Sequence, residues 1–215
     1  MLRVQSLSSY YGNIQALRGI SIHVGYGEIV TLLGANGAGK TTTIRMLIGL
    51  LRPTSGEISV GGIDVLKYPE KVRKIIGYMS QKFSLYEDLT VEENLNFFGG
   101  VYGLSNQDLQ RRKKELLELT DMLGWEKYLT KELSTGMKQR LGLAVSIIHK
   151  PRIVFLDEPT SGTDPLSRRN FWRIIQNLAQ EGICVFVTTH FLEEAEYCNK
   201  ISMIDAGKII ATGSP

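Results

Sequence analysis

The chain has 215 residues, 43% of them hydrophobic and 22% charged, with a formal net charge of +3. These values suit one α/β domain, or one core with an inserted lobe, and exclude a disordered chain. The net charge is too small to indicate nucleic-acid binding, because such proteins usually concentrate basic residues in a patch. Two cysteines, Cys184 and Cys198, are too few for a disulfide framework, which fits a reducing compartment. Cys184 stands in an apolar run, so we expect a small core residue.

A membrane-spanning helix needs about 20 apolar residues, and no stretch of the sequence approaches that length. The start, Met1–Gln5, has polar residues where a signal peptide has its apolar run. We therefore expect a chain that is soluble by itself and that needs a partner for any role at a membrane.

In chain order, the first clear element is the apolar run Ile29–Leu33, a predicted strand. It leads into the glycine-rich segment Gly34–Thr41. A helix is predicted to follow, because apolar residues recur at helical spacing, and Pro53 is predicted to close it. These apolar residues are Ile44, Leu47, Ile48 and Leu51.

The next predicted elements are a hairpin, a strand and a helical region. Segments 57–60 and 63–65 flank Gly61-Gly62, a typical two-residue hairpin turn. A strand is predicted at 75–80, and the pattern from about 85 to 150 is helical, which indicates an inserted lobe. We expect two features there: a solvated charged face at Arg111–Lys114 and one apolar stripe, formed by Leu109, Leu116, Leu119 and Leu123.

Strand patterns return after this region, at 153–156, 184–188 and 201–204. Between the first two, Asp164 and Pro165 are predicted to start a helix. Trp172, Ile175 and Leu178 lie on one face of that helix, and Gly182 ends it. Strands that alternate with helices predict an α/β fold with a largely parallel sheet covered on both faces.

The segment Gly34–Thr41 matches the phosphate-binding pattern G-x-x-x-x-G-K-[ST]. Its glycines let backbone N–H groups turn toward phosphate oxygens, and the following helix directs its positive dipole end at the same anion. Lys40 is expected to reach the β- and γ-phosphates, and the Thr41 hydroxyl to ligate Mg²⁺. The alternative is a glycine-rich turn without a ligand, which a strand before and a helix after make the weaker interpretation.

A carboxylate pair, Asp157-Glu158, ends the predicted strand at 153–156. Ligands of open parallel sheets bind at the carboxyl ends of strands, so Asp157 is placed to hold the Mg²⁺ shell. Glu158 would orient and deprotonate the attacking water, a role that contributes about 10²- to 10⁴-fold in rate. Alone, such a pair would be an ordinary polar strand end, but the upstream phosphate-binding pattern favours the catalytic interpretation.

The remaining motifs closely resemble one family, the nucleotide-binding domains of ABC transporters. Leu133-Ser134-Thr135-Gly136 looks like the family signature Leu-Ser-x-Gly. Further motifs stand in the family's order between about Leu2 and Gly213: the adenine-stacking aromatic at Tyr11, the Q-loop glutamine at Gln81, the D-loop at Ser161–Asp164 and the switch histidine at His190. Each has an ordinary structural interpretation alone, and one phosphate site explains them together.

The resemblance implies a P-loop NTPase (RecA-like) core with a mostly parallel sheet, a small antiparallel β subdomain and an inserted α-helical subdomain. We expect a single ATPase domain over 1–215, with the core at about 1–84 and 151–215 and the helical subdomain at about 85–150. It further implies an ATP-hydrolysing transporter subunit, peripheral on the cytoplasmic face of the cell membrane. Its expected partners are a transmembrane permease bound through the helical subdomain and a second nucleotide-binding subunit, identical or different. No nucleic-acid partner is expected.

In this interpretation ATP and Mg²⁺ are bound at a head-to-tail dimer interface. The expected catalytic residues are Lys40, Gln81, Glu158 and His190, and the expected Mg²⁺ ligands are Thr41, Gln81 and Asp157. The nucleotide would be held within one chain by Tyr11, Gly34, Asn36, Gly37, Ala38, Gly39, Lys40, Thr41 and Thr42. Ser134 and Gly136 of the other chain would contact the γ-phosphate, at the N-terminus of a signature helix predicted from about 135 to 150.

Two positions depart from the family pattern: Met137, where glutamine is usual, and Thr163, where leucine is frequent. The string Leu133–Arg140 resembles a subgroup of drug- or sodium-exporter ATPases, whereas the opening, Tyr10–Lys40, looks more like amino-acid importers. The helical lobe also holds a dense aromatic-apolar group, in which we expect mostly ordinary core and one or two residues facing the membrane partner. The group comprises Phe83, Leu85, Tyr86, Phe97, Phe98 and Tyr102.

Two alternatives remain. A soluble ABC-type translation factor would carry two such domains joined by a charged helical linker, and a DNA-repair ATPase of this type would carry a long coiled coil; the sequence contains neither feature. A non-catalytic regulatory module is disfavoured because Lys40, Asp157, Glu158 and His190 are all present.

Overall fold

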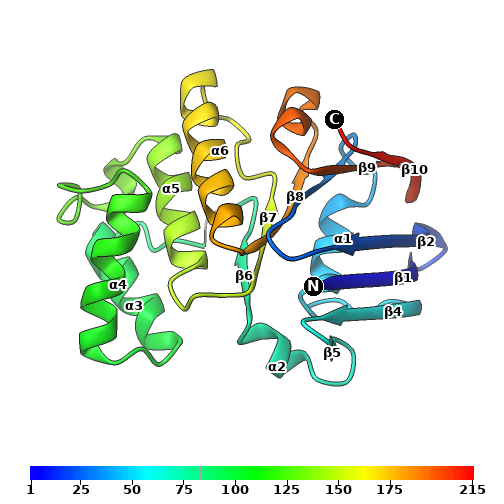
Figure 1. The fold of residues 1–215 in the computed structure, drawn as a ribbon, viewed down its shortest axis with the longest axis horizontal. Helices are drawn as coiled ribbons and strands as arrows, with labels where there is room; N and C mark the ends of the chain where they lie inside the picture. Colours follow the sequence, from blue (N-terminus) through cyan, green and yellow to red (C-terminus); the bar gives the residue numbers. More distant parts are fainter. Residues whose placement is uncertain (83) are drawn as a thin grey trace.

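The computed structural model describes residues 1–82 and 84–215, which form two sheets and a group of helices (Figure 1). The strands are β1 (Leu2–Tyr11), β2 (Ile14–Val24), β3 (Ile29–Leu33), β4 (Ser55–Val60), β5 (Ile63–Asp64), β6 (Ile76–Met79), β7 (Ile153–Asp157), β8 (Cys184–Thr189), β9 (Lys200–Asp205) and β10 (Lys208–Gly213). The α-helices are α1 (Lys40–Leu47), α2 (Pro69–Arg73), α3 (Val91–Val101), α4 (Asn106–Leu119), α5 (Thr135–Ser146) and α6 (Pro165–Gln180), and the 3₁₀ helices are η1 (Thr130–Glu132) and η2 (Leu192–Tyr197).

The larger sheet has the strand order β10-β9-β3-β8-β7-β6. Its pairs β3–β8, β3–β9, β6–β7 and β7–β8 are parallel, and only β10 joins antiparallel among the described strands. The smaller sheet, β2-β1-β4-β5, is antiparallel throughout. The α/β fold with a mostly parallel sheet and a small antiparallel sheet is therefore confirmed.

The central strands of the larger sheet are buried on both faces, and their alternate residues enter two different cores. In β7, Val154 and Leu156 pack with α5 and α6, whereas Ile153 and Phe155 pack with α1 and the antiparallel sheet. Because side chains of a strand point alternately to opposite faces, a continuous apolar run is what a sheet covered on both sides requires. The buried strands fix the sheet edge at which the glycine loop and Asp157 lie.

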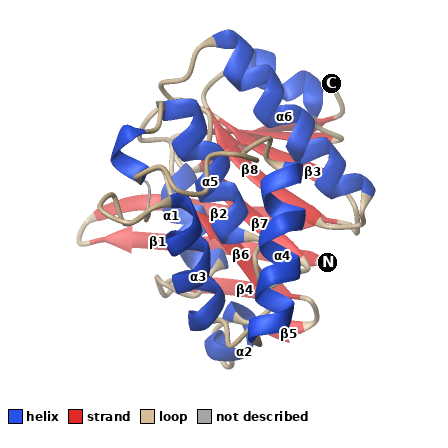
Figure 2. Ribbon diagram, turned by 90° about the vertical axis from the view of Figure 1, so that its left-hand side faces the viewer, coloured by secondary structure: helices blue, strands red, loops and turns tan. Residues whose placement is uncertain are grey.

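Helices α3, α4 and α5 lie on one side of the molecule, away from the antiparallel sheet (Figures 1 and 2). They come between β6 and β7 in the chain. Capping side chains define the first residues of two of them: Thr90 and Glu93 form a capping box at α3, and Ser105 accepts a hydrogen bond from the Asp108 N–H at α4. After β7, α6 begins at the predicted cap, Asp164, with Pro165 in its first turn.

Several predicted boundaries are correct and others are wrong. The strand at 29–33 and the hairpin at Gly61-Gly62 are confirmed, with both turn glycines at positive φ. Helix α1 ends at Leu47, before Pro53, and Gly49 with φ +73° follows it. The signature helix ends at Ser146 rather than near residue 150.

Two expectations about the helical lobe are wrong in part. Leu123 lies beyond the end of α4 and is 55% exposed, because the chain leaves the helix at Thr120 and turns. In the charged run 111–114, Lys113 is buried and its Nζ lies 2.6 Å from Glu92 Oε1. Arg112 donates to the carbonyl oxygens of Ile147 and Ile148 at the end of α5, so half of the run is structural rather than solvated.

The aromatic-apolar group of the lobe is divided between core and surface. Leu85 and Phe98 pack against the buried cluster, and Tyr86, Phe97 and Tyr102 are 41–48% exposed. Tyr86 and Phe97 meet edge to face at 4.7 Å, and Phe83 lies outside the described residues. Within the described part of the chain, no helix combines the length and apolar character that a membrane span requires.

Candidate functional site

The glycine-rich segment lies between the end of β3 and the first turn of α1, at the carboxyl edge of the parallel sheet (Figure 1). At two positions of this segment, neighbouring atoms leave no room for a Cβ atom, so glycine is required. A Cβ atom at Gly34 would lie 2.3 Å from the Ile204 carbonyl oxygen, and one at Gly39, where φ is +107°, would lie 2.8 Å from Leu17. The loop therefore closes tightly around the N-terminus of α1, where unpaired backbone N–H groups favour an anion.

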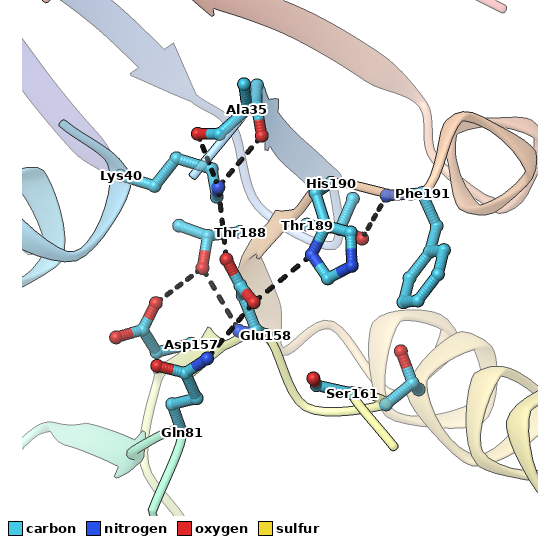
Figure 3. Close-up of polar contacts among 12 residues, drawn as sticks. Ala35, Lys40, Gln81, Asp157, Glu158, Ser161, Thr188, Thr189, His190 and Phe191 are labelled. Carbon is cyan, nitrogen blue, oxygen red and sulfur yellow. Dashed lines mark hydrogen bonds and ion pairs between the residues drawn. The ribbon is translucent and has the colours of Figure 1, made fainter. Parts of the chain in front are cut away.

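Lys40 is the first residue of α1, and its ammonium group points back into the loop (Figure 3). Its Nζ donates to the carbonyl oxygens of Gly34 at 2.8 Å and Ala35 at 3.0 Å, and lies 3.0 Å from Glu158 Oε1. The Lys40 side chain is only 4% exposed. The Lys40 ammonium group is thus buried at the centre of the loop, where it can bind a second anionic group besides the Glu158 carboxylate.

Glu158 is the point at which the predicted catalytic residues converge (Figure 3). One carboxylate oxygen contacts Lys40, and the other lies 3.2 Å from both Gln81 Nε2 and His190 Nδ1. The backbone N–H of Glu158 donates to the carbonyl and hydroxyl oxygens of Thr188, and its φ is +48°. A left-handed conformation at a non-glycine residue in such a setting is typical of functional sites.

Asp157, the residue before Glu158, ends β7 and is 1% exposed. Its Oδ1 accepts hydrogen bonds from the hydroxyls of Thr188 at 2.7 Å and Thr41 at 3.2 Å. Burial first, and then the negative charge of Asp157, raise the pKa of the Tyr78 hydroxyl above its ordinary value. A buried carboxylate beside hydroxyl oxygens is a donor set of the hard-oxygen type that Mg²⁺ prefers.

A cavity of about 520 Å³ opens from this loop toward the β1–β2 hairpin. Its size is within the range of small-molecule sites. Of the residues predicted to bind the nucleotide or act on it, those that line the cavity are Tyr11, Asn36, Gly37, Gly39, Lys40, Thr41, Thr42, Gln81 and Glu158. The Tyr11 ring is 48% exposed at its mouth, so it is available for stacking.

Sequence reasoning missed six further lining residues, four from the start of strand β2 and two from the β9–β10 turn. They are Ile14, Gln15, Ala16, Arg18, Ala206 and Gly207. The Arg18 N–H donates to the Gly207 carbonyl, which brings the start of β2 beside the β9–β10 turn. The hairpin signal at Gly12 and the turn at Ala206-Gly207 mark these segments, but nothing local places them beside the glycine loop.

Ser134 and Gly136 stand at the N-terminus of α5, and as far as the described residues define the cavity they lie outside it. The Ser134 side chain is the N-cap and accepts from the Met137 N–H at 3.4 Å. Gly136 faces α6, since a Cβ there would lie 2.9 Å from Ser167 Oγ. The chain therefore does not bring these two predicted nucleotide contacts to its own glycine loop.

The fold and the glycine loop define a P-loop nucleotide-binding protein: a parallel sheet, a phosphate-type loop before α1, and buried carboxylates at the end of a neighbouring strand.

Comparison with known proteins narrows this class to one family. The ABC transporter family model matches residues 17–161. The chain is 47% identical over 215 residues to the probable multidrug ABC transporter ATP-binding protein YbhF of Escherichia coli K12, and 39% identical over 215 residues to the linearmycin resistance ATP-binding protein LnrL of Bacillus subtilis 168. The chain belongs to the ABC transporter family of ATP-binding proteins.

The alignments with the E. coli and B. subtilis relatives each cover the whole chain, including the segment Tyr10–Lys40, for which the sequence alone predicts a likeness to importers. The chain spans 37% of the length of the E. coli relative and 69% of that from B. subtilis. Among solved structures, the dimeric bacterial ABC transporter cassette MJ0796 superposes with a TM-score of 0.89 at 25% identity, covering 100% of this chain and 98% of that one. These relatives make the translation-factor, DNA-repair and regulatory alternatives the weaker ones.

Proposed function

We propose that this chain is the ATP-binding and ATP-hydrolysing part of an ABC transporter and works against a second nucleotide-binding unit. The observation that carries the proposal is the convergence of Lys40, Gln81 and His190 on the carboxylate of Glu158, directly beside the glycine loop. Three polar side chains placed around one buried acid indicate a functional site rather than a purely structural turn.

The cavity fits ATP by charge and by shape. The β- and γ-phosphates would lie in the glycine loop, bound by backbone N–H groups, by the N-terminal dipole of α1 and by Lys40. The base would lie toward the β1–β2 hairpin, where Tyr11 can stack on it. Gly34 and Ala38 would contribute to the shape of the loop, and Asn36, Gly37, Gly39 and Thr42 line the cavity itself.

The residues present also fit Mg²⁺. The Thr41 hydroxyl donates to Asp157 Oδ1, and Gln81 Nε2 contacts Glu158, the residue after Asp157. The hydroxyl of Thr41, the carboxylate of Asp157 and the amide oxygen of Gln81 would be the ligands, and all three are oxygen donors. A bound Mg²⁺ would neutralise charge on the β- and γ-phosphates. The Thr188 hydroxyl fixes Asp157 in its orientation, because it donates to the same carboxylate oxygen that Thr41 contacts.

Hydrolysis would use Glu158 as the base that takes a proton from the attacking water. Its contact with Lys40 keeps the carboxylate directed at the loop. His190 would hold the γ-phosphate and keep Glu158 in place, and Gln81 would orient the water. The positive φ of Glu158 directs its side chain toward the loop rather than along the strand.

The position of Ser134 supports a dimer. It caps α5 on the exposed surface, and among the described residues it is not part of the cavity lining, so the serine hydroxyl and the helix N-terminus are available to a second unit. Ser134 and Gly136 of one unit would contact the γ-phosphate bound by the other. ATP would bind the closed pair better than the open one and shift the population toward closure, and loss of the γ-phosphate would release it. MJ0796, similar in fold and length, is dimeric.

The proposed domain consists of a core at about 1–84 and 151–215 and a helical subdomain at about 85–150. We propose that the helical subdomain binds the transmembrane permease, which would place the chain on the cytoplasmic face of the membrane. The exposed aromatics Tyr86, Phe97 and Tyr102 support this assignment, since such residues are enriched at protein interfaces. The names of the two relatives, a multidrug transporter protein and a resistance protein, favour an exporter.

The test is phosphate release from ATP by the intact protein. We expect turnover that depends on Mg²⁺, stops with EDTA and falls sharply in Asp157→Asn, because the amide cannot replace the carboxylate charge. Turnover by the wild type that continues unchanged in EDTA and in Asp157→Asn would remove Asp157 and Mg²⁺ from the proposal.

A further inference from the structure

A buried carboxylate outside the ATP cavity has no place in the proposed reaction. Glu194, in η2, is 0% exposed. The Thr160 hydroxyl donates to its Oε1, and Arg168 Nε lies 3.6 Å from the same oxygen. Its Oε2 has no hydrogen-bond partner among the described residues. A carboxylate in such a setting is expensive to bury, so its position calls for an explanation.

The groups around Glu194 belong to three separate segments. Thr160 lies two residues after Glu158, beyond the end of β7, and its carbonyl oxygen accepts from the Thr163 hydroxyl at 2.6 Å. Arg168 lies in the first turns of α6, where its N–H donates to the Asp164 carbonyl. Glu194 itself follows His190 by four residues. The Glu194 carboxylate therefore joins the segment after Glu158 to the segment after His190.

A second set of contacts leads from Arg168 to the histidine. The Arg168 guanidinium stacks over the Phe191 ring at 4.0 Å from its centroid, and the Phe191 ring lies 4.1 Å from the His190 ring. The Phe191 N–H donates to Thr189 Oγ1 at 3.0 Å, which fixes the backbone between the two rings. A guanidinium held between a carboxylate and an aromatic face has little rotational freedom.

We propose that Glu194 is a positioning residue for ATP hydrolysis: through Thr160, and through Arg168 and Phe191, it fixes His190 relative to Glu158. The proposal rests on the proposed function. His190 Nδ1 lies 3.2 Å from Glu158 Oε2, and each residue directly follows a strand, outside the helices and strands themselves. A displacement of about 1 Å at such a pair can reduce a rate by about 100-fold.

The decisive variant is Glu194→Gln, which keeps the shape and the acceptor for Thr160 but removes the charge that faces Arg168. We expect kcat for ATP hydrolysis to fall about 10-fold, with the KM for ATP within about twofold of the wild type, because the nucleotide cavity is not touched. Glu196→Gln is the matched control: Glu196 lies in the same 3₁₀ helix, its side chain is exposed, and the kcat of this variant should not change.

Arg168→Lys is a second variant that does not depend on a buried substitution. It keeps the positive charge and loses the planar group that stacks on Phe191, so kcat should fall by several-fold at unchanged KM. Equal kcat values in the wild type, Glu194→Gln and Arg168→Lys would overturn the proposal.

A double-substitution cycle with His190→Ala separates positioning from general structural support. If Glu194 acts through His190, adding Glu194→Gln to His190→Ala should lower kcat by less than about twofold. An additional 10-fold loss in that background would overturn the proposal. A wild-type protein without ATPase activity would instead contradict the proposed function, whereas normal wild-type activity with no effect of Glu194→Gln would contradict this inference alone.

Discussion

Two regions of the molecule are proposed to contact a γ-phosphate, but only one of them is complete within the chain. Around the glycine loop, Lys40, Asp157 and Glu158 are buried and each has two or more polar partners. At the N-terminus of α5, Ser134 is exposed and caps its own helix. The first region is fixed by the folding of one chain, and the second would act only when another unit supplies a phosphate.

This difference separates four substitutions by the step that each should affect. Changes around the glycine loop should alter binding or chemistry in the chain itself. Changes at α5 should leave the ATP affinity of the single, open unit unaltered and lower turnover, because they act on the site of the neighbouring unit.

The largest effect is expected for Glu158→Gln. The amide cannot take a proton from water, so phosphate release should fall by about 10²- to 10⁴-fold. ATP affinity should remain, since Lys40 keeps its contacts with the Gly34 and Ala35 carbonyls. Steady-state phosphate release and equilibrium ATP binding measure the two quantities. Unchanged turnover would remove Glu158 from the role of base.

Ser134→Asp tests the α5 region. Asp caps a helix as well as Ser does, so folding should be preserved, but its charge would oppose a γ-phosphate at several kcal/mol, which lowers turnover by more than about 10-fold. Ser105→Asp, at the exposed N-cap of α4, is the matched control. The ATP affinity of the open, monomeric protein, measured by calorimetry at low protein concentration, should be the same in the wild type and in both variants. Full activity in Ser134→Asp would place α5 outside the reaction.

Lys40→Ala should weaken ATP binding by about 10- to 100-fold, the loss expected for a hydrogen bond to a charged group. The substitution also leaves the buried Glu158 carboxylate without its ammonium partner. Calorimetry of ATP binding, with a thermal unfolding curve as the control for folding, tests the prediction. Normal affinity in a folded protein would contradict the phosphate-loop assignment.

The smallest effect is expected for Tyr11→Ala. Base–aromatic stacking contributes about 1–3 kcal/mol, and because Tyr11 is half-exposed we expect the lower end of that range, a loss of ATP affinity of about fivefold. Tyr10→Ala is the matched control, because Tyr10 is equally exposed, at 49%, and is not among the described residues that line the cavity. Equal ATP affinities of the two variants would show that Tyr11 is an ordinary surface aromatic that does not stack on the base.

The sequence predicts the strand-loop-helix around Lys40 and the carboxylates at the end of β7, because both depend on short local patterns. Strand β2, which supplies Gln15 and Arg18 to the cavity, alternates regularly only at residues 20–24, beyond the part that lines the cavity. Its register shifts three times along the pair with β1, and most of its exposed positions are polar. The regular alternation of apolar and polar residues is lost wherever a bulge occurs, so this alternation does not reveal the full length of these strands.

Burial of charge is the second property that local patterns miss. Lys113 stands in a basic run and Glu194 in an acidic one, yet both are buried, since their neighbours Glu92, Thr160 and Arg168 come from distant parts of the chain. Asp164 shows the opposite case. Its capping role is visible in the sequence, and hydrogen bonds from Ser167 lower the pKa of its carboxyl.

The most direct test of the account is a structure of the Glu158→Gln protein with ATP and Mg²⁺. We predict a triphosphate in the loop beside Lys40, the base against Tyr11, and the γ-phosphate contacted by the α5 N-terminus of a second unit. A nucleotide bound elsewhere, or Ser134 turned to solvent while ATP fills the loop, would contradict it.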